Sequence, residues 1–287
     1  MRNVFVVILA VLTAGLISGG ICAQTYRIDW YSINSGGGLV TGGSYKLNSS
    51  VGQPVAGFVK STSFLHWIGF WAGEVPTPTV APTINAAKLL GDGTFVSVAG
   101  KIATSGRNPI TGITDRFSGF FYLEEADRHS GIRISCPSWP ITDLLRGSVI
   151  NVIGTMGTTG AGERQIVAPI VIITSTTTPP PPLGMNNRAV GGAAFGSPPL
   201  GQSGVIGGTG LNNIGLLIKT WGEVTYKEPS GAYILITDGA GAPVRIDTAG
   251  LASVPSEGYV SVIGISSLYT GPSPLVLPRT DSDIEPR

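Results

Sequence analysis

The sequence predicts an all-β protein in which two tandem five-stranded barrels follow a small glycine-rich β-hairpin unit. Composition is the first observation. The chain has 42 glycines, 21 prolines and only 12% charged residues, which favours many short strands and turns over long helices. The second observation is a hydrophobic fraction of 42%, which is sufficient for packed cores. The third is an internal recurrence, because the apolar segments and turns of residues 117–154 return in similar order at residues 233–264.

The first 23 residues have the three parts of a secretory signal peptide. Arg2 supplies a positive start, residues 4–17 are apolar, and small residues lead to Ala23, after which we expect cleavage. One alternative is a retained anchor, although the apolar run is shorter than the roughly 20 residues of a span. Another is a lipid-modified Cys22. We expect a mature chain without a membrane span, secreted or in the cell envelope (extracellular or periplasmic).

Charge and cysteine content exclude several kinds of partner. The chain has 18 lysines and arginines, so loss of Arg2 leaves 17 basic residues against 17 acidic ones. A net charge near zero gives no global field for attracting nucleic acid or an anionic membrane. If Cys22 leaves with the signal peptide, Cys136 remains as a lone thiol, so we expect no metal site built from several cysteines and no cofactor.

The first half of the chain divides at changes of composition. Residues 24–74 are a glycine-rich hairpin unit with expected strands at 26–33, 44–51 and 64–71. Residues 75–84 are a proline-rich linker. Residues 85–175 form the first barrel, with strands expected at 94–103, 119–125, 131–135, 148–155 and 165–174 and a short helix at 141–145.

The second half repeats this order after a proline-rich boundary. Residues 176–211 are a proline- and glycine-rich linker and lead-in. Residues 212–280 form the second barrel, with strands expected at 214–226, 231–238, 243–247, 258–268 and 274–277. Its helix is reduced to residues 248–253. Residues 281–287 are a polar tail that we expect to fray.

Three strands, a short helix and two further strands are the element order of the OB-fold. Both halves resemble this oligonucleotide- and oligosaccharide-binding barrel, and the chain resembles tandem OB-fold domains of secreted bacterial proteins. The paired positions are Gly100 with Gly222 (122 residues apart), Arg133 with Arg245 (112) and Gly154 with Gly264 (110). The resemblance implies a ligand face on the outer side of the second and third strands, but it does not identify a ligand, because the fold serves many functions.

Strand alternation predicts which side chains form that face. The inward side chains are expected to be Phe121, Leu123, Ile132 and Ile134 in the first half and Ile234, Ile236, Val244 and Ile246 in the second. The outward candidates for a ligand face are Phe120, Tyr122, Arg133, Lys219, Trp221, Tyr233 and Arg245. Aromatic rings beside arginine suit a stacked base, and rings alone suit a sugar. The alternative is that these side chains are covered by the lead-in, by the hairpins or by the other barrel.

Motifs for catalysis are missing from the sequence. It has no phosphate-binding glycine loop, no closely spaced cysteine pair, no His-x-x-x-His and no Gly-x-Ser-x-Gly, so we expect no enzyme and no metal site. Carboxylates and an imidazole gather at residues 124–129, where we expect a solvated hairpin turn. We therefore expect an exported, non-catalytic binding or surface-interaction protein with a protein or glycan partner. An extracellular single-stranded nucleic-acid-binding protein and an enzyme with its site between the barrels are the alternatives.

Overall fold

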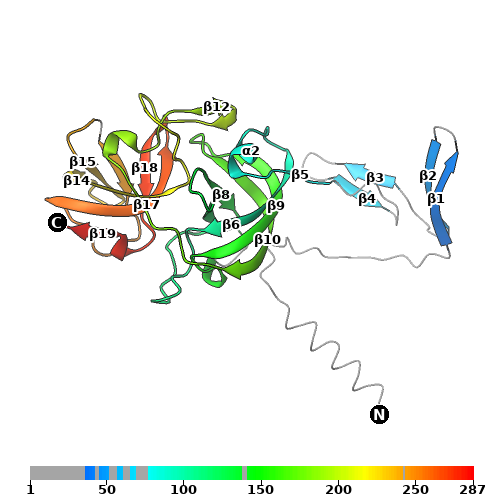
Figure 1. Cartoon of the computed structure of the whole chain (residues 1–287), viewed down its shortest axis with the longest axis horizontal. Helices are drawn as coiled ribbons and strands as arrows, with labels where there is room; N and C mark the ends of the chain where they lie inside the picture. Colours follow the sequence, from blue (N-terminus) through cyan, green and yellow to red (C-terminus); the bar gives the residue numbers. More distant parts are fainter. Residues whose placement is uncertain are drawn as a thin grey trace, which may run out of the picture. The chain divides into compact units, whose positions relative to one another are not determined.

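A computed structural model of the chain describes the backbone at residues 36–42, 45–51, 57–60 and 65–68, and then residues 77–137, 141–241 and 243–287 (Figure 1). The described part is all-β, as the sequence predicts. The chain divides into one unit at Thr25–Thr77 and another that contains Pro78–Arg287.

The smaller unit contains two antiparallel hairpins. Strand β1 (Gly36–Gly42) pairs with β2 (Tyr45–Val51), and β3 (Gly57–Lys60) pairs with β4 (Leu65–Ile68). The strand expected at residues 26–33 lies outside the described residues.

The first large sheet has six strands, and the five that follow its first strand close into a barrel. Its strands are β5 (Thr79–Val80), β6 (Phe95–Ala103), β7 (Phe120–Glu124), β8 (Gly131–Ser135), β9 (Ser148–Thr158) and β10 (Arg164–Thr176). They pair in the order β5-β6-β7-β8-β10-β9, and β6 also pairs with β9, which closes the ring. Strands β8 and β10 run parallel. The single-turn helix η1 (Ile141–Asp143) lies where a short helix was expected.

The barrel core follows the predicted alternation. Phe121, Leu123, Ile132 and Ile134 are each at most 1% exposed and pack in one cluster, so the prediction that they point inward is confirmed. Strands rich in β-branched and aromatic residues suit this arrangement, because alternate side chains meet inside the barrel.

The expected proline-rich linker at 75–84 is partly built into the first sheet. Strand β5 pairs with the start of β6, and a helix, α2 (Ile84–Lys88), begins directly afterwards. The Thr83 hydroxyl accepts the backbone N–H of Ala86, which caps this helix. Ile84 and Ala87 join the barrel core. These short elements were not predicted, because their sequence carries no extended periodic pattern.

The second large sheet has the same pairing pattern. Its strands are β11 (Leu183–Gly184), β14 (Leu217–Lys227), β15 (Tyr233–Thr237), β16 (Val244–Asp247), β17 (Tyr259–Tyr269), β18 (Ser273–Leu277) and β19 (Ile284–Pro286). They pair in the order β11-β14-β15-β16-β18-β17-β19, β14 also pairs with β17, and β16 and β18 run parallel. The predicted inward residues Ile234, Ile236, Val244 and Ile246 are all fully buried.

The segment between the two sheets contains short elements of its own. They are η2 (Asn187–Ala189), β12 (Phe195–Ser197) and β13 (Leu200–Gln202), and β12 pairs with β13. Val190 lies in the core of the second sheet, so this lead-in helps to cover that core.

The prediction of a fraying tail at residues 281–287 is wrong. A single-turn helix, η3 (Asp281–Asp283), follows Thr280, and β19 then pairs with β17. Ile284 is 5% exposed and joins the core of the second sheet. The Asp283 carboxylate accepts hydrogen bonds from the backbone and side chain of Arg279, so polar residues in this segment are partnered and not solvated.

In the full-length chain the described part contains no free cysteine. The expectation of a lone thiol at Cys136 concerns the chain after loss of residues 1–23 and stays a prediction. Cys136 is 1% exposed and lies at the end of β8 in the barrel core.

Candidate interaction surface

The outer face of β7 in the first sheet is covered by the second sheet. Phe117 and Tyr122 form a buried cluster with Leu217, Ile265, Leu275 and Leu277, and Phe120 packs against it. Tyr122 is 0% exposed, so this candidate does not lie on an open face. The other sheet covers it, which was the alternative expectation. Phe120 keeps partial exposure, and the guanidinium carbon of Arg133 lies 3.5 Å from its ring centroid.

A buried carboxylate, that of Glu163, lies near Arg133, which is itself partly exposed. The hydroxyl of Tyr122 donates to Glu163 at 3.2 Å, and the hydroxyl of Ser267, from the second sheet, donates to the same carboxylate at 2.9 Å. Burial raises the pKa of Glu163, and the charge of Arg133 opposes that rise. Nearby, the Lys88 ammonium donates to the carbonyl of Ile214 at 2.9 Å, and burial lowers its pKa to about 7.

The turn between β7 and β8 is part of the same contact. Glu124 is 0% exposed, accepts the backbone N–H of Leu217 and lies 3.3 Å from Arg128 Nε. Burial raises its pKa to about 7. The expectation of a solvated turn is therefore wrong for Glu124, while the side chains of Asp127 and His129 are 66% and 73% exposed. Alternation could have indicated this, because Glu124 lies on the same side of β7 as Tyr122.

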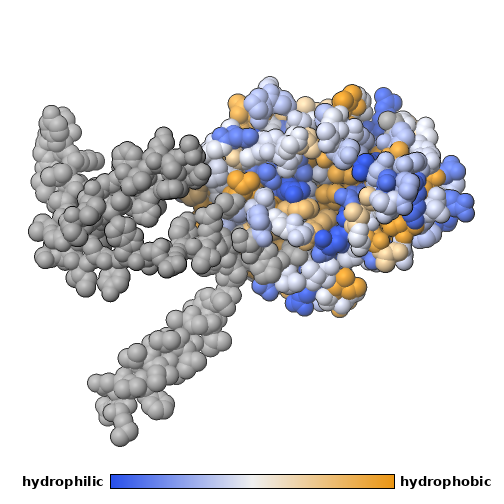
Figure 2. All heavy atoms as spheres, turned by 180° about the vertical axis from the view of Figure 1, so that it is seen from behind, coloured by the Kyte–Doolittle hydropathy of each residue, from blue (hydrophilic) through white to orange (hydrophobic). Residues whose placement is uncertain are grey.

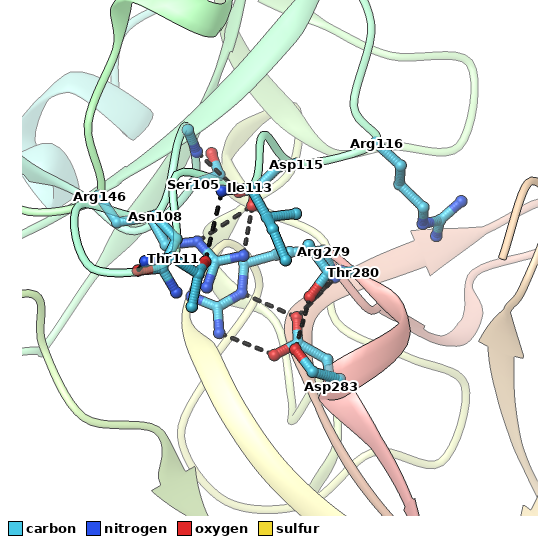
Figure 3. Close-up of polar contacts among 12 residues, drawn as sticks. Ser105, Asn108, Thr111, Ile113, Asp115, Arg116, Arg146, Arg279, Thr280 and Asp283 are labelled. Atoms are coloured by element: carbon cyan, nitrogen blue, oxygen red, sulfur yellow. Dashed lines mark hydrogen bonds and ion pairs between the residues drawn. The ribbon is translucent and has the colours of Figure 1, made fainter. Parts of the chain in front are cut away.

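Ion pairs flank the apolar contact (Figure 3). Arg146 Nε donates to Asp115 at 3.0 Å, and Arg279, held by Asp283 at 3.0 Å, donates to the carbonyl of Thr104 at 3.0 Å. Arg116 extends away from this cluster and bonds Asp247 at 3.2 Å, across to the second sheet. The two sheets are therefore joined by charge-assisted hydrogen bonds as well as by apolar packing.

The backbones of the two sheets also approach closely. A Cβ added at Gly131 would overlap the carbonyl of Gly215, and one added at Gly215 would overlap Gly131. Only glycine permits this approach, which brings the β8 end against the start of the second sheet.

The corresponding face of the second sheet is open. The guanidinium carbon of Arg245 lies 3.5 Å from the ring centroid of Tyr233 and 4.0 Å from that of Tyr269. The ring of Tyr226 lies 5.7 Å from that of Tyr233. Tyr226 and Tyr269 are 44% and 43% exposed, and Tyr233 and Arg245 are partly exposed. We call Tyr226, Tyr233, Arg245 and Tyr269 the open tyrosine–arginine face.

Arg245 is held in a way that leaves its donors available. Within the described residues its side chain makes no hydrogen bond and no ion pair, while the rings of Tyr233 and Tyr269 lie against its guanidinium. A guanidinium fixed by aromatic rings presents N–H groups in a fork that matches a carboxylate. This face can therefore bind an anionic group beside apolar side chains.

The remaining candidates, Lys219 and Trp221, lie apart from that face. Trp221 is 52% exposed, and its ring centroid lies 6.4 Å from that of Tyr259. Lys219 is half-buried and opposite Ile263 of β17. The structure therefore brings Tyr233 and Arg245 together and places Trp221 beside a different tyrosine.

A pocket of about 380 Å³ lies between the β14–β15 loop and the segment after β16. Lys227, Ser230, Leu251 and Val254 contribute to its lining. Its one ammonium group is already engaged, because Lys227 Nζ donates to the carbonyl of Val254 at 2.7 Å. Sequence reasoning missed this pocket, since two loops distant in sequence form it.

Hydrophobic residues interrupt the polar surface in several places on the face shown in Figure 2. Among the described side chains, large exposed ones include Val80 at 76%, Ile170 at 42% and Ile172 at 47%. All three belong to the first sheet.

The described residues contain no group of three or more His, Cys, Asp or Glu placed to hold a metal ion. No helix in the described ranges is long and apolar enough to cross a membrane. No family model matches the chain, and no curated protein matches it.

Proposed function

We propose that this is an exported, non-catalytic binding protein that docks a protein partner on the open tyrosine–arginine face. One observation carries the proposal: the corresponding face of the first sheet already binds a protein surface, that of the second sheet. Phe120 with Arg133 and Tyr233 with Arg245 occupy the same places in their sheets, on the second and third strands, and both pairs stack at 3.5 Å.

The proposal includes the fold. We infer that the second sheet is a barrel like the first and that both are OB-folds. The supporting observation is the strand order, which in both sheets runs first, second, third, fifth, fourth and back to first, with the third and fifth strands parallel. The second and third strands, which carry the open face, are the ligand-binding strands of that fold.

The covered face also indicates the chemistry of a partner. Around Phe120 and Arg133 lie aliphatic side chains of the second sheet and the carboxylate of Glu163. Since that carboxylate belongs to the first sheet itself, a partner of the open face would resemble the second sheet and bring aliphatic side chains. Interfaces enriched in tyrosine and arginine commonly concentrate binding energy in such residues.

A displayed random-peptide library tests the function. Peptides are selected on the mature chain, with the Arg245→Glu chain as the counter-selection, and Trp221→Ala is the exposed control. We expect the enriched peptides to be rich in aliphatic residues and to bind the Arg245→Glu chain at least about tenfold more weakly, the loss that corresponds to about 1.4 kcal/mol. Peptides that bind both chains equally would contradict the proposal.

Binding assays with the same kind of variants also test two other ligand classes, nucleic acids and glycans. Single-stranded DNA that quenches tryptophan fluorescence at about 50 mM salt, weakens steeply at about 200 mM and fails to bind Arg245→Glu would replace the protein partner with nucleic acid. A glycan that binds the natural chain and fails with Tyr233→Ala would replace it with a sugar. The near-zero charge of the mature chain favours neither salt-sensitive binding nor an anionic polymer.

A further inference from the structure

The contact between the two sheets joins two different surfaces, one from each sheet. The first sheet contributes the outer face of its second strand, with Phe120 and Tyr122. The second sheet contributes an apolar row across its first, fourth and fifth strands, because Leu217 is opposite Ile265 and Ile265 is opposite Leu277. The contact is therefore heterologous, and each sheet uses only one of its two surfaces in it.

The surface that the first sheet does not use is the counterpart of that apolar row. Across its own first, fourth and fifth strands, Phe95 is opposite Thr155, and Thr155 is opposite Val167. The next row runs from Val80 through Ser97 and Ile153 to Ile170. We call Val80, Phe95, Ile153, Val167, Ile170 and Ile172 the outer patch of the first sheet.

The outer patch is apolar and accessible. Val80, Ile170 and Ile172 are among the exposed large hydrophobic side chains, and Phe95, Ile153 and Val167 are each partly exposed. On β6, β9 and β10 alternation turns these side chains away from the barrel core, and both residues of β5 are exposed. Contiguous exposed apolar residues of this kind mark interaction sites.

The second sheet also has one surface that is not used in the contact. Its open tyrosine–arginine face corresponds to the face of the first sheet that is covered, and no described residue covers it in the same way. Within one chain, the outer face of β7 is therefore bound to the apolar row of the second sheet. The open tyrosine–arginine face and the outer patch, which correspond to these two surfaces, are both unoccupied by described residues.

We propose that the partner docked on the open tyrosine–arginine face is a second copy of this chain, bound through its outer patch in a head-to-tail contact that repeats the internal one. This inference rests on the proposed function and names its partner. The contact is heterologous, so it generates a ring where the rotation closes and an open fibre where it does not.

The chain also holds the acidic group that such a contact needs. In the internal contact, the charge of Arg133 acts on Glu163, which lies in the turn before β10 and belongs to the first sheet itself. The corresponding arginine, Arg245, acts on the exposed carboxylate of Glu228, whose pKa is lowered mainly by the Ser230 hydroxyl and to a smaller degree by Arg245. The apolar outer patch therefore needs no acidic residue of its own to complete the docked arrangement.

Sedimentation of the mature full-length chain from about 1 to 200 µM tests the inference, since protein interfaces commonly reach micromolar affinity or better. We expect larger species to grow with concentration. Ile170→Glu on the outer patch and Arg245→Glu on the open face should each raise the dissociation constant of self-association at least about tenfold. Trp221→Ala, an exposed aromatic outside both surfaces, should leave it unchanged. Circular dichroism and thermal unfolding verify that each variant is folded.

Mixing the two variants gives the sharper result. Each is defective in a different surface, so one intact pair remains between an Arg245→Glu chain and an Ile170→Glu chain. We expect the mixture to form one-to-one dimers and nothing larger, while each variant alone stays monomeric.

Three different results would contradict the proposed self-association, and each has its own meaning. A natural chain that stays monomeric throughout the range overturns the inference, and selection of Arg245-dependent peptides would then keep the proposed function with another partner. Association that persists in both variants places the self-contact elsewhere. Loss in Arg245→Glu alone shows that the outer patch is not the docked surface.

Discussion

At the scale of the residue, Arg133 and Arg245 have the same stacking geometry and opposite surroundings. Each guanidinium lies 3.5 Å from the ring of an aromatic residue on the neighbouring strand. Neither arginine forms an ion pair among the described residues, but Arg133 acts on the buried carboxylate of Glu163 at the contact between the sheets, whereas Arg245 acts on the carboxylate of Glu228 outside that contact. The difference follows from what covers the face and not from the local sequence.

Burial of carboxyl groups at that contact makes stability depend on pH. The folded-state pKa of Glu124 is raised to about 7 from 4.5, so between these values the folded chain binds more protons than the unfolded chain. The free energy of unfolding must therefore fall as pH rises through this window, by up to about 3 kcal/mol from this group.

Denaturant unfolding between about pH 5 and pH 8 tests this effect. We expect Glu124→Gln to make the curve flatter, because the amide oxygen can still accept the Leu217 N–H but does not ionise. Some slope should remain, since burial also raises the pKa values of Glu163 and Asp115. Parallel curves for the two chains would show that Glu124 titrates as it does in the unfolded state.

At the scale of the element, period-two alternation was a sufficient guide to the long strands. It predicted all five strands of the first barrel and the inward side of β7 and β8. It failed for β5, α2 and β19, which have two, five and three residues and are stabilised by pairing, capping and burial against the sheets. Such segments are too short to carry a period of their own.

The face of each strand was predictable, but its exposure was not. Alternation correctly turned Tyr122 and Arg245 away from their cores. Whether an outward side chain meets water or another sheet depends on tertiary packing, which a single strand does not encode. The sequence therefore predicted the candidates as a set, and the structure separates Tyr122 from Tyr233 and Arg245.

The last strand provides a test at this scale. Ile284 is 5% exposed and packs in the core of the second sheet, so Ile284→Ala should lower the free energy of unfolding by roughly 2 kcal/mol or more. Glu285→Ala on the same strand, where the side chain is 51% exposed, should change it by less than about 0.5 kcal/mol. Equal, small effects of both substitutions would mean that the C-terminal residues are not part of the fold.

At the scale of the whole molecule, two similar sheets are joined asymmetrically. One contact combines several interactions. It contains the apolar cluster, the ion pairs Arg146–Asp115 and Arg279–Asp283 beside it, and the close backbone approach at Gly131. That contact occupies one face of the first sheet and leaves the corresponding face of the second sheet free. We propose binding at this face because the corresponding face of the first sheet packs against an aliphatic protein surface.

The most direct test of this account is hydroxyl-radical footprinting of the dilute, folded chain, read residue by residue by mass spectrometry. We predict rapid oxidation of Tyr226, Tyr233 and Tyr269, and protection of Phe117 and Tyr122 until the chain unfolds. Oxidation of Tyr122 as fast as that of Tyr233 would show that both faces are open. It would remove the basis for treating the first sheet as the occupied copy of the second.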